Sequence, residues 1–387
     1  MMSKNKYSRI LVMLAAVISG GAWGATPVCS QYMGRPTRVN ETPTITSQAI
    51  SIGADVPVGT VLLTINANNT AQANSLPSIT CAPASDGSTY NINQYLRLFG
   101  VARPVAGWTG QYAGALYQTD VSGIGFAIVN RDGTTAGQAI QNATPVLKWT
   151  TPISPPGFSF YYGNRISVVF IKTGPISPGV ISGASLTRVV LSASSSITTT
   201  GLETTPWITQ FTGSIPVTVS TCNVASSPTV SLGKHNIETY FGSGRQNSTP
   251  WVPFSVLLSG CTQFLGTNAT GTVELLTTSS ATYSNWQTNY LQTTFVPVYG
   301  VIDDAQAIMR LQPVTGSATG VGIQIAQDTG AVDPVAFSFS TGLRQDIRTN
   351  VPGSIAIPMK ARYIRNGTDP VRPGLANSRT VFTVNYR

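Results

Sequence analysis

The sequence predicts an all-β protein made of two β-sandwich domains, and three observations predict this fold class. First, Gly (37) and Pro (25) are abundant and only 10% of the residues are charged, whereas helical domains need many Glu, Lys and Ala residues. Second, short stretches alternate apolar and polar residues, as half-buried strands do. Third, turn signals such as Asp86-Gly87 and Asp132-Gly133 separate these stretches. A length of 387 residues suits two domains of ordinary size.

The first residues are expected to form a signal peptide, 1–24, rather than part of the fold. Three basic residues precede an apolar run over 10–18, which is the order of an export signal. The small residues Ala22 and Gly24 predict cleavage after Gly24. The run is well short of the roughly 20 apolar residues that a membrane-spanning helix needs. We therefore expect an exported chain rather than an anchored one.

The first half, 25–213, predicts a sandwich or barrel of many short strands joined by turns. Thr173-Gly174-Pro175 and Ser177-Pro178-Gly179 are further turn signals. The composition changes around Pro216, and this places a linker at 214–221. The strands expected in this half are 58–65, 95–101, 124–130, 146–149, 166–172 and 186–191.

The second half, 222–387, repeats this pattern. Its terminal stretch places Phe382, Val384 and Tyr386 on one face. Because this strand runs directly into Arg387, we expect its neighbours to come from elsewhere, with no later segment to cover it. The strands expected in this half are 229–232, 254–258, 271–276, 320–326, 335–339, 354–363 and 379–386.

Four cysteines allow three disulfide pairings in an oxidising compartment. The wide gap between the second and the third makes one loop in each half the simplest choice, which pairs Cys29 with Cys81 and Cys222 with Cys261. A metal site would need more ligands than one histidine and widely separated thiols supply. We expect structural disulfides, no metal and no cofactor.

The charge of the chain argues against a nucleic-acid partner. The net charge of +9 includes three positive charges of the signal peptide, so the mature chain carries 20 minus 14, or +6. Residues 25–213 hold nine basic and six acidic residues, so this half is no polycation. No basic cluster with interleaved aromatic residues stands out, and we therefore expect no nucleic-acid binding.

Motifs of the second half resemble, in order, the pilin domain of chaperone-usher fimbriae. A penultimate tyrosine on an alternating terminal strand is among the strongest marks of that family. The matching stretches are Cys222-Asn-Val, Val230-Ser-Leu-Gly, Phe254-Ser-Val-Leu-Leu-Ser-Gly-Cys261, Gly320-Val-Gly-Ile-Gln-Ile and Pro373-Gly-Leu-Ala-Asn-Ser-Arg-Thr-Val-Phe-Thr-Val-Asn-Tyr386.

The resemblance implies an immunoglobulin-like sandwich that lacks its last strand, which a neighbouring subunit supplies. It also implies three assembly partners: a periplasmic chaperone, an outer-membrane usher and the donor strand of the adjacent fimbrial subunit. By analogy the chaperone or subunit contacts Phe382, Val384 and Tyr386 and holds the carboxylate of Arg387. An ordinary edge strand of a complete sandwich is the alternative.

The first half is similar to the receptor-binding domain of fimbrial adhesins, particularly that of type 3 fimbriae. The stretches that carry this similarity are Val56-Pro-Val-Gly-Thr-Val61, Gly123-Ile-Gly-Phe126 and Phe170-Ile-Lys-Thr-Gly174. A whole domain in place of a short donor segment resembles a two-domain tip adhesin. We therefore expect an adhesin at the fimbrial tip, exported through the periplasm to the cell surface, that binds a host glycan or extracellular-matrix protein.

Mannose specificity is not carried over. In the mannose-binding adhesins of type 1 fimbriae the mature chain begins with a bulky aromatic residue, whereas this chain would begin Ala25-Thr26-Pro27.

Candidate receptor-binding residues follow from the chemistry of sugar recognition. Carboxylates and amides bind hydroxyl groups, and aromatic faces cover apolar C–H patches. A structural role as a turn former or half-buried aromatic is the alternative for each residue. The candidates are Asp86, Tyr90 and Asn91 after Cys81, and Trp108, Tyr112, Tyr117 and Asp120 further on, with Trp149, Tyr161, Tyr162 and Asn164 as additional ones.

Two other functions remain open from the sequence. One is a non-adhesive structural or capping tip subunit with the same second half. The other is a secreted glycoside hydrolase, in which two of the carboxylates Asp86, Asp120, Asp132 and Glu203 would meet in space. A serine hydrolase would have to use His235, and no Gly-x-Ser-x-Gly elbow is present. We expect that the protein is not an enzyme.

Overall fold

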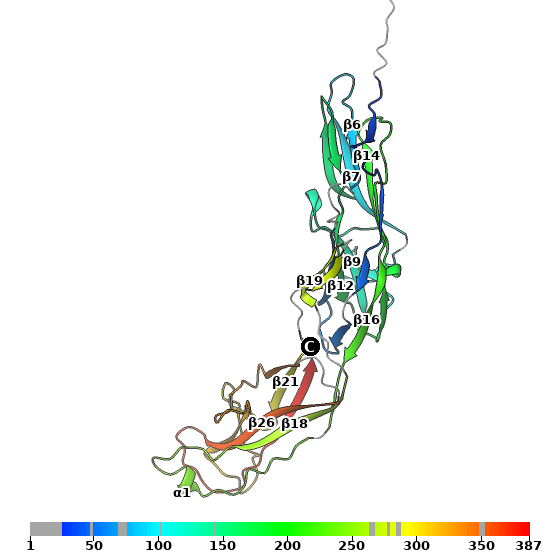
Figure 1. Cartoon of the computed structure of the whole chain (residues 1–387). Coiled ribbons are helices and arrows are strands. Elements are labelled where there is room, and N and C mark those ends of the chain that lie inside the picture. Colours follow the sequence, from blue (N-terminus) through cyan, green and yellow to red (C-terminus); the bar gives the residue numbers. More distant parts are fainter. Residues whose placement is uncertain are drawn as a thin grey trace, which may run out of the picture.

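A computed structural model shows a chain folded into two lobes that follow one another along the sequence (Figure 1). The structure describes residues 25–46, 49–68, 76–100, 102–142, 144–225, 227–262, 268–276, 279–283, 288–347 and 353–387. The signal peptide predicted over 1–24 lies outside the described residues. Strands make up nearly all of the regular secondary structure in the described part, as predicted. Its helices are η1 (Gly133–Thr135), η2 (Gly183–Ser185) and α1 (Ile237–Tyr240).

Each lobe has its own hydrophobic core. Trp207 and Phe170 lie in the centre of the first core, with at most 1% of their surface exposed. Leu258 and Met359 are equally buried in the second core. The two clusters share no residue, so each lobe has a separate hydrophobic core.

The first lobe contains four sheets, with the strand orders β1-β6-β11, β10-β7-β14-β15-β2, β20-β19-β5-β12-β9-β8 and β13-β16-β3, where β4 also pairs with β16. Its own strands are β1 (Cys29–Gln31), β2 (Val39–Glu41), β3 (Thr44–Thr46), β4 (Ile50–Gly53), β5 (Val61–Asn68), β6 (Ser78–Cys81), β7 (Tyr90–Phe99), β8 (Tyr117–Gln118), β9 (Ile124–Asn130), β10 (Val146–Ile153), β11 (Phe158–Tyr161), β12 (Arg165–Lys172), β13 (Gly179–Ser182), β14 (Arg188–Ser195), β15 (Trp207–Thr209) and β16 (Thr212–Ser220).

Strand β9 is buried on both faces, which explains its continuous apolar sequence. Phe126 and Ile128 pack into the main core of the lobe, whereas Ala127 and Val129 pack into a second, smaller cluster on the opposite face. A strand covered on both sides reads as an unbroken hydrophobic run rather than an alternating one.

The second lobe is a sandwich of two antiparallel sheets around one core. The larger sheet has the order β17-β18-β26-β24-β23-β22 and the smaller has the order β25-β21-β27. The strands are β17 (Asn223–Val224), β18 (Val252–Cys261), β21 (Tyr290–Pro297), β22 (Val301–Asp303), β23 (Ile308–Met309), β24 (Val321–Gln327), β25 (Leu343–Asp346), β26 (Gly353–Arg365) and β27 (Thr380–Tyr386).

One hairpin of the second half joins a sheet of the first lobe. It consists of β19 (Asn268–Leu276) and β20 (Ser279–Tyr283). Strand β19 pairs in parallel with β5, so that Val273 lies opposite Ile65 and Leu276 opposite Asn68. Figure 1 shows β19 in the first lobe, away from the rest of the second lobe.

The segment 214–221, which the sequence predicted as a linker, is strand through Ser220. It belongs to β16, which pairs antiparallel with β13 and in parallel with β3 and β4. The reason is its apolar alternation, because Ile215 and Val217 are buried in the first core. We propose that the domain boundary falls immediately after Ser220.

Two other expected strands are not strands in the structure. Residues 229–232 are extended but belong to no sheet. In the stretch 335–339, Val335 makes only an isolated bridge to Gln327, while Phe337 and Phe339 are buried in the second core. Apolar alternation predicted burial correctly at 337 and 339, but it does not supply the hydrogen-bonded neighbour that a strand needs.

Both expected disulfides are present and each lies within one lobe. Cys29 lies directly opposite Cys81 in the pairing of β1 with β6. Cys222 is bonded to Cys261, at the end of β18. The adjacent positions of the bonded residues agree with a structural role.

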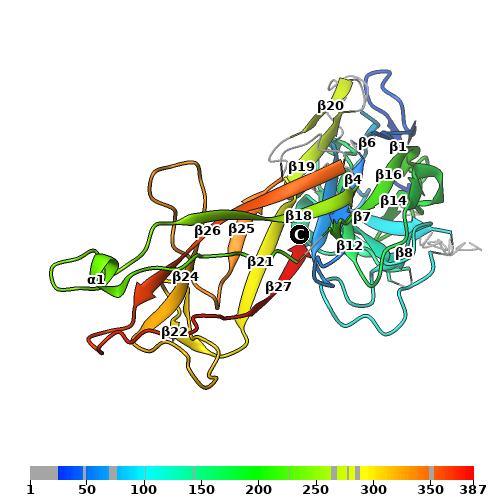
Figure 2. The same ribbon diagram turned by 90° about the horizontal axis from the view of Figure 1, so that it is seen from below.

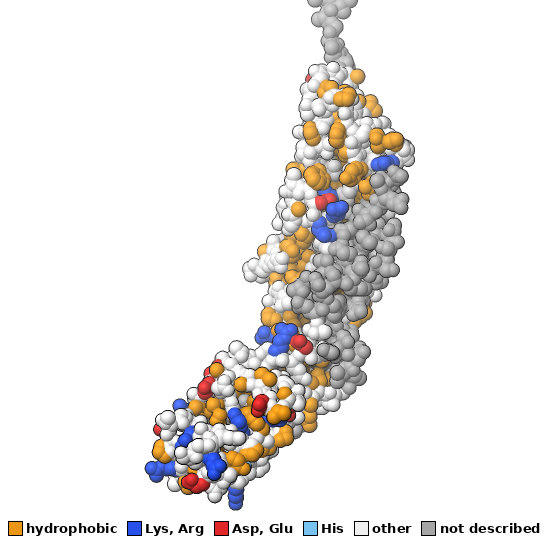
Figure 3. Space-filling model, turned by 60° about the vertical axis from the view of Figure 1, so that its left-hand side comes forward, with side chains coloured by type: hydrophobic (Ala, Val, Ile, Leu, Met, Phe, Trp, Pro, Cys, Tyr) orange, Lys and Arg blue, Asp and Glu red, His pale blue; other side chains and the backbone are white. Residues whose placement is uncertain are grey.

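The surface carries few charges on the face of the first lobe shown in Figure 3, while both signs are more frequent on the second lobe. Within the described residues, no helix combines the length and apolar character required to span a membrane.

Candidate functional site

The terminal strand β27 lies at the edge of its sheet. It pairs antiparallel with β21, with Phe382 opposite Phe295 and Val384 opposite Thr293. In the order β25-β21-β27 it has a neighbour on one side only. Figure 2 shows β27 beside β21, with the chain end at the junction of the two lobes. One row of backbone groups along β27 therefore faces away from its sheet.

The side chains of β27 alternate between the core and the surface. Val381 is 57% exposed and Thr383 is exposed. Phe382 and Val384 are half-buried and pack against the second core, where the rings of Phe382 and Phe295 lie 6.4 Å apart between their centroids. The core is thus only partly covered beside this strand.

Tyr386 anchors the end of β27. Its hydroxyl donates a hydrogen bond of 3.0 Å to the carbonyl of Cys222, and burial raises the pKa of this phenol. The next residue, Arg387, exchanges two backbone hydrogen bonds with Tyr290, of 3.0 and 2.6 Å. The last residues of the chain are therefore fixed by contacts on both sides.

A second extended stretch, 229–232, packs on the same core without a strand partner. Val230 is half-buried and Leu232 is buried, whereas Thr229 and Ser231 are exposed. This is the alternation of a strand. Among the described residues, no backbone hydrogen bond joins this stretch to β27. The edge strand β27 and the stretch 229–232 thus pack on the same apolar core, with no backbone hydrogen bond between them among the described residues.

Four of the predicted receptor-binding residues are buried, which corrects the prediction for them. Tyr162 and Asn164 are 0% and 2% exposed. Tyr90 and Tyr117 are each 1% exposed. The Tyr90 hydroxyl donates to the Ala82 carbonyl at 2.7 Å, and the Tyr117 hydroxyl accepts from the Asn142 N–H at 2.8 Å. Their apolar rings complete the first core, so these phenols have structural roles.

Three of the other predicted residues make hydrogen bonds to different partners. Asp86 lies in an exposed turn and accepts the N–H of Ser88 at 2.9 Å, and this turn lowers its pKa. Asn91 lies in β7 and its N–H donates to the Ser196 hydroxyl. Asp120 accepts from the hydroxyl of Ser185 at 2.6 Å and from the N–H of Ser182.

Trp108 and Tyr112 cover the smaller cluster of the first lobe, which contains Ala127 and Val129. The Trp108 indole N–H donates to the carbonyl of Gln111 at 2.8 Å. Their contacts are those of half-buried aromatic residues that close a loop over a sheet.

The carboxylates required for a glycoside hydrolase have different partners. Asp132 lies 3.0 Å from the buried Lys148 amine, and Glu203 accepts the N–H of Thr205. Asp86 and Asp120 are held by serines, as described above. This arrangement supports no catalytic pair among the four.

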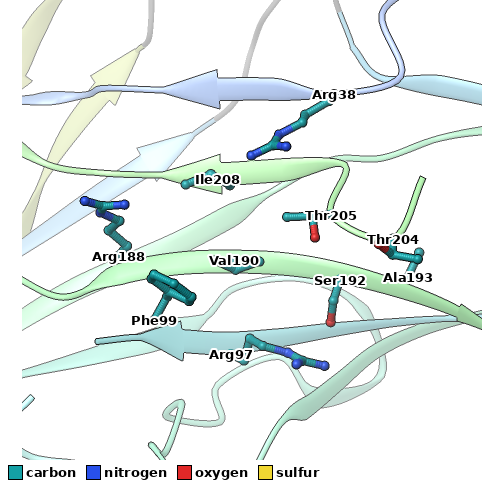
Figure 4. Close-up of a pocket in the computed structure, with 10 residues that line it drawn as sticks. All are labelled: Arg38, Arg97, Phe99, Arg188, Val190, Ser192, Ala193, Thr204, Thr205 and Ile208. Carbon is teal, nitrogen blue, oxygen red and sulfur yellow. The ribbon is translucent and has the colours of Figure 1, made fainter. Parts of the chain in front are cut away.

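Sequence reasoning missed a hollow on the outer face of the first lobe (Figure 4). It has a volume of about 550 Å³. Its walls include Arg38, Arg97 and Arg188, and its floor includes Phe99, Val190 and Ile208. Figure 4 shows the three arginines distributed around Val190 and Ile208.

The strand register assembles this hollow. In the outer face of the sheet, Arg97 lies opposite Val190 and Phe99 lies opposite Arg188, while Ile208 continues the row beside Val190. Strand β7 alternates buried Leu96 and Leu98 with exposed Arg97 and Phe99. That alternation was the available signal, but the sequence does not tell which strands lie side by side.

Comparison with known proteins agrees with the architecture. The second lobe is a sandwich in which β27 lies at the edge of the smaller sheet. Residues 209–387 match the family model described as Fimbrial protein.

The curated relatives belong to the same class. The chain is 36% identical over 121 residues to the type-1 fimbrial protein A chain of Escherichia coli K12, which covers 28% of this chain and 62% of that protein. It is also 36% identical over 120 residues to the fimbrial subunit type 1 of Klebsiella pneumoniae, with 28% and 61% covered. The chain thus spans about three fifths of the length of these relatives. They are fimbrial proteins and not enzymes.

Two solved structures are similar to larger parts of the chain. The CupB6 tip adhesin of Pseudomonas aeruginosa covers 93% of this chain and 94% of its own, with 17% identity and a TM-score of 0.33. The receptor-binding domain of the adhesin MrkD1P of Klebsiella pneumoniae covers 53% of this chain and 99% of its own, with 16% identity and a TM-score of 0.29.

Proposed function

We propose that this protein is the tip adhesin of a chaperone-usher fimbria. Its second domain joins the fibre by accepting a strand from the adjacent subunit, and its first domain binds a host receptor. One observation carries the proposal: β27 has a partner on one side only, while Phe382 and Val384 leave the core beside it half-covered.

Strand addition would provide β27 with a second strand partner and would also cover the core beside it. An incoming strand pairs with the outward backbone groups of β27 that precede Tyr386, and its alternate apolar side chains fill the space over the core. Left uncovered, such an edge favours aggregation. A periplasmic chaperone is therefore the proposed first partner, the outer-membrane usher the second and the donor strand of the next subunit the final one.

The tip position follows from the first domain. A folded domain precedes the second one, where a subunit within the fibre would carry a short donor segment. Strand β16 belongs to a sheet of the first domain. Cys222, which packs against the second core, follows it closely in the sequence. The proposed location is thus the cell surface, at the end of the fibre.

Substitution on the two faces of β27 tests the strand-addition step. Val384→Arg places a charge over the half-buried core, whereas Thr383→Arg, one residue away, places it on the exposed face. In cells that produce complete fimbriae, we expect Val384→Arg to remove the chain from purified fimbriae and Thr383→Arg to leave it there. Equal incorporation of both variants would refute the proposal.

The amount of each variant in the periplasm is measured in parallel with co-produced chaperone. Recovery of Val384→Arg as a soluble, folded chain that fails only to incorporate would assign the defect to the acceptor edge. The non-adhesive alternative predicts normal incorporation as well, so attachment of the cells to host surfaces separates the two functions.

A further inference from the structure

The hollow described by Arg38, Arg97 and Arg188 combines positive charge with an apolar floor. All three arginines are exposed, as their places on the outer face of the sheet require. Phe99 is 60% exposed, and the guanidinium of Arg188 lies 6.0 Å from the centre of its ring. The hollow therefore presents an exposed aromatic ring beside exposed cations.

Among the described residues, no ion pair joins these arginines to a carboxylate of the first domain. Its six acidic residues are Glu41, Asp55, Asp86, Asp120, Asp132 and Glu203. Each has another partner among the described residues: Glu41 the Trp207 indole, Asp55 the Tyr386 N–H, Asp86 Ser88, Asp120 Ser185, Asp132 Lys148 and Glu203 Thr205. The positive charge of the hollow is therefore available to an outside anion.

Arginine is the side chain suited to sulfate and carboxylate groups. Its planar guanidinium presents paired N–H donors that match two oxygens of such a group, and it loses water more easily than an ammonium does. The floor of Phe99, Val190 and Ile208 offers the apolar surface on which the C–H face of a sugar ring packs. The two features together are those of a site for an acidic sugar.

The spacing of the arginines favours a chain over a single sugar. Arg97 lies on β7, Arg188 on β14, and Arg38 immediately before β2, in the strand order β7-β14-β15-β2. Three strand spacings of ~4.8 Å separate β7 from β2, or about 14 Å. One carboxylate on one ring cannot reach both ends, whereas anionic groups on successive sugars can.

We propose that this hollow binds a linear sulfated glycosaminoglycan. The inference rests on the proposed function, because it names the receptor class of the first domain. Sulfate and carboxylate groups on neighbouring sugars contact Arg38, Arg97 and Arg188, while the sugar rings lie over Phe99 and Val190.

Fimbriated cells that display the full chain provide the test. Their attachment to immobilised heparin is compared with attachment to chemically desulfated heparin and to hyaluronan, which carries carboxylates without sulfate. We expect binding to heparin, with at least about tenfold weaker binding to the other two, since charge-assisted hydrogen bonds to several sulfates are lost. Equal binding to all three would overturn the proposal.

Variants locate the binding. Arg97→Gln and Arg188→Gln should each weaken heparin attachment by about tenfold, whereas Arg103→Gln, an exposed arginine outside the hollow, should not. Arg188→Lys keeps the positive charge but loses the paired N–H donors of the guanidinium, so its heparin attachment should lie between those of Arg188→Gln and the original chain. An equal loss with Arg103→Gln would show non-specific charge binding and overturn the site.

The same cells distinguish this inference from the proposed function. If they attach to host cells through the chain, lose attachment in the triple Arg38→Gln, Arg97→Gln, Arg188→Gln variant, and yet ignore heparin, the adhesin function stands and the sulfated ligand is wrong. If cells lacking the whole chain attach as well as cells that have it, the adhesin function itself fails. Antibody staining of surface chain normalises each comparison.

Discussion

Asp55 and Tyr386, one from each lobe, are joined by two reciprocal hydrogen bonds. The Asp55 N–H donates to the Tyr386 carbonyl at 3.2 Å, and the Asp55 carboxylate accepts the Tyr386 N–H at 3.0 Å. Close by, the Asn289 side chain donates to the Ser51 carbonyl at 3.1 Å. The strand proposed to accept a donor is thereby fixed at its end to the base of the first domain.

A methyl group at position 53 should open this contact. The Cβ of an added alanine would lie 2.1 Å from the Tyr386 carbonyl oxygen, so Gly53→Ala must displace the strand end at a cost of about 1–3 kcal/mol. We expect faster amide hydrogen exchange at Asp55 and Tyr386. Gly174→Ala, where an added Cβ meets no atom within 4 Å, is the matched control. Unchanged exchange in Gly53→Ala would show that the lobes do not depend on this contact.

Tyr162→Phe should stabilise the first domain at neutral pH. The Tyr162 hydroxyl is buried and has no hydrogen-bond partner among the described residues, so its removal is expected to raise the free energy of unfolding by about 1 kcal/mol. Tyr90→Phe is the contrasting variant, because it removes the bond to Ala82 and should lower that free energy by about 1 kcal/mol. Urea unfolding measures both, and a shift of the same sign in the two variants would contradict the assignment.

The same tyrosine predicts a pH dependence. Burial, with a smaller contribution from Glu203, raises the pKa of Tyr162 in the folded chain. The folded state therefore keeps its proton above pH ~10, where the unfolded state loses it. Stability should be complete below that pH and fall as the pH rises, by up to about 1.4 kcal/mol per pH unit from this group. In Tyr162→Phe the free energy of unfolding should fall less steeply as the pH rises. Equal slopes for the variant and the original chain would disprove the contribution of Tyr162.

Removal of the second disulfide should weaken the second domain selectively. The bond between Cys222 and Cys261 closes a loop with a sequence separation of 39, and its loss by substitution of both residues to serine should cost about 4 kcal/mol on the chain-entropy model. We expect the unfolding transition of the second lobe to move and that of the first, which keeps Cys29–Cys81, to stay. Calorimetry of the full chain resolves the two, and an equal shift of both would argue for one cooperative unit.

Cross-linking tests the insertion of the β19–β20 hairpin into the first lobe. Ala67 of β5 lies opposite Leu275 of β19, so the double variant Ala67→Cys, Leu275→Cys should form a disulfide, since neighbouring strands bring Cα atoms within bonding range. The control Ala67→Cys, Glu274→Cys is one residue out of register and should remain reduced. Peptide mass analysis after oxidation identifies the bond. Its absence in the first variant would place the hairpin elsewhere.

Much of the fold was accessible from local pattern. An apolar run before the turn at Asp132-Gly133 located the strand over Ile124–Asn130 to the residue, and alternation located the terminal strand within one residue. The cysteine spacing suggested both disulfides. The stretch 229–232 was predicted as a strand and its side chains do alternate in burial, yet it has no strand partner among the described residues. Pairing depends on a neighbour that sequence pattern does not reveal.

The candidate site was less accessible. Tyr90 and Tyr117 were chosen for their polar hydroxyls, but their large apolar rings gain more from burial, and nearby backbone groups satisfy the hydroxyls. Arg97 and Arg188 carried no signal of their own, since single exposed arginines are ordinary surface residues.

The sequence by itself determined the strands, the disulfide loops and the terminal strand Thr380–Tyr386, because these depend on residues close together in the chain or on a period of two. Only the tertiary structure decided that β19 joins β5, that Arg38, Arg97 and Arg188 surround one hollow, and that Asp55 holds Tyr386. These contacts join residues far apart in the sequence, and their partners are selected by the packing of whole sheets, which no local pattern encodes.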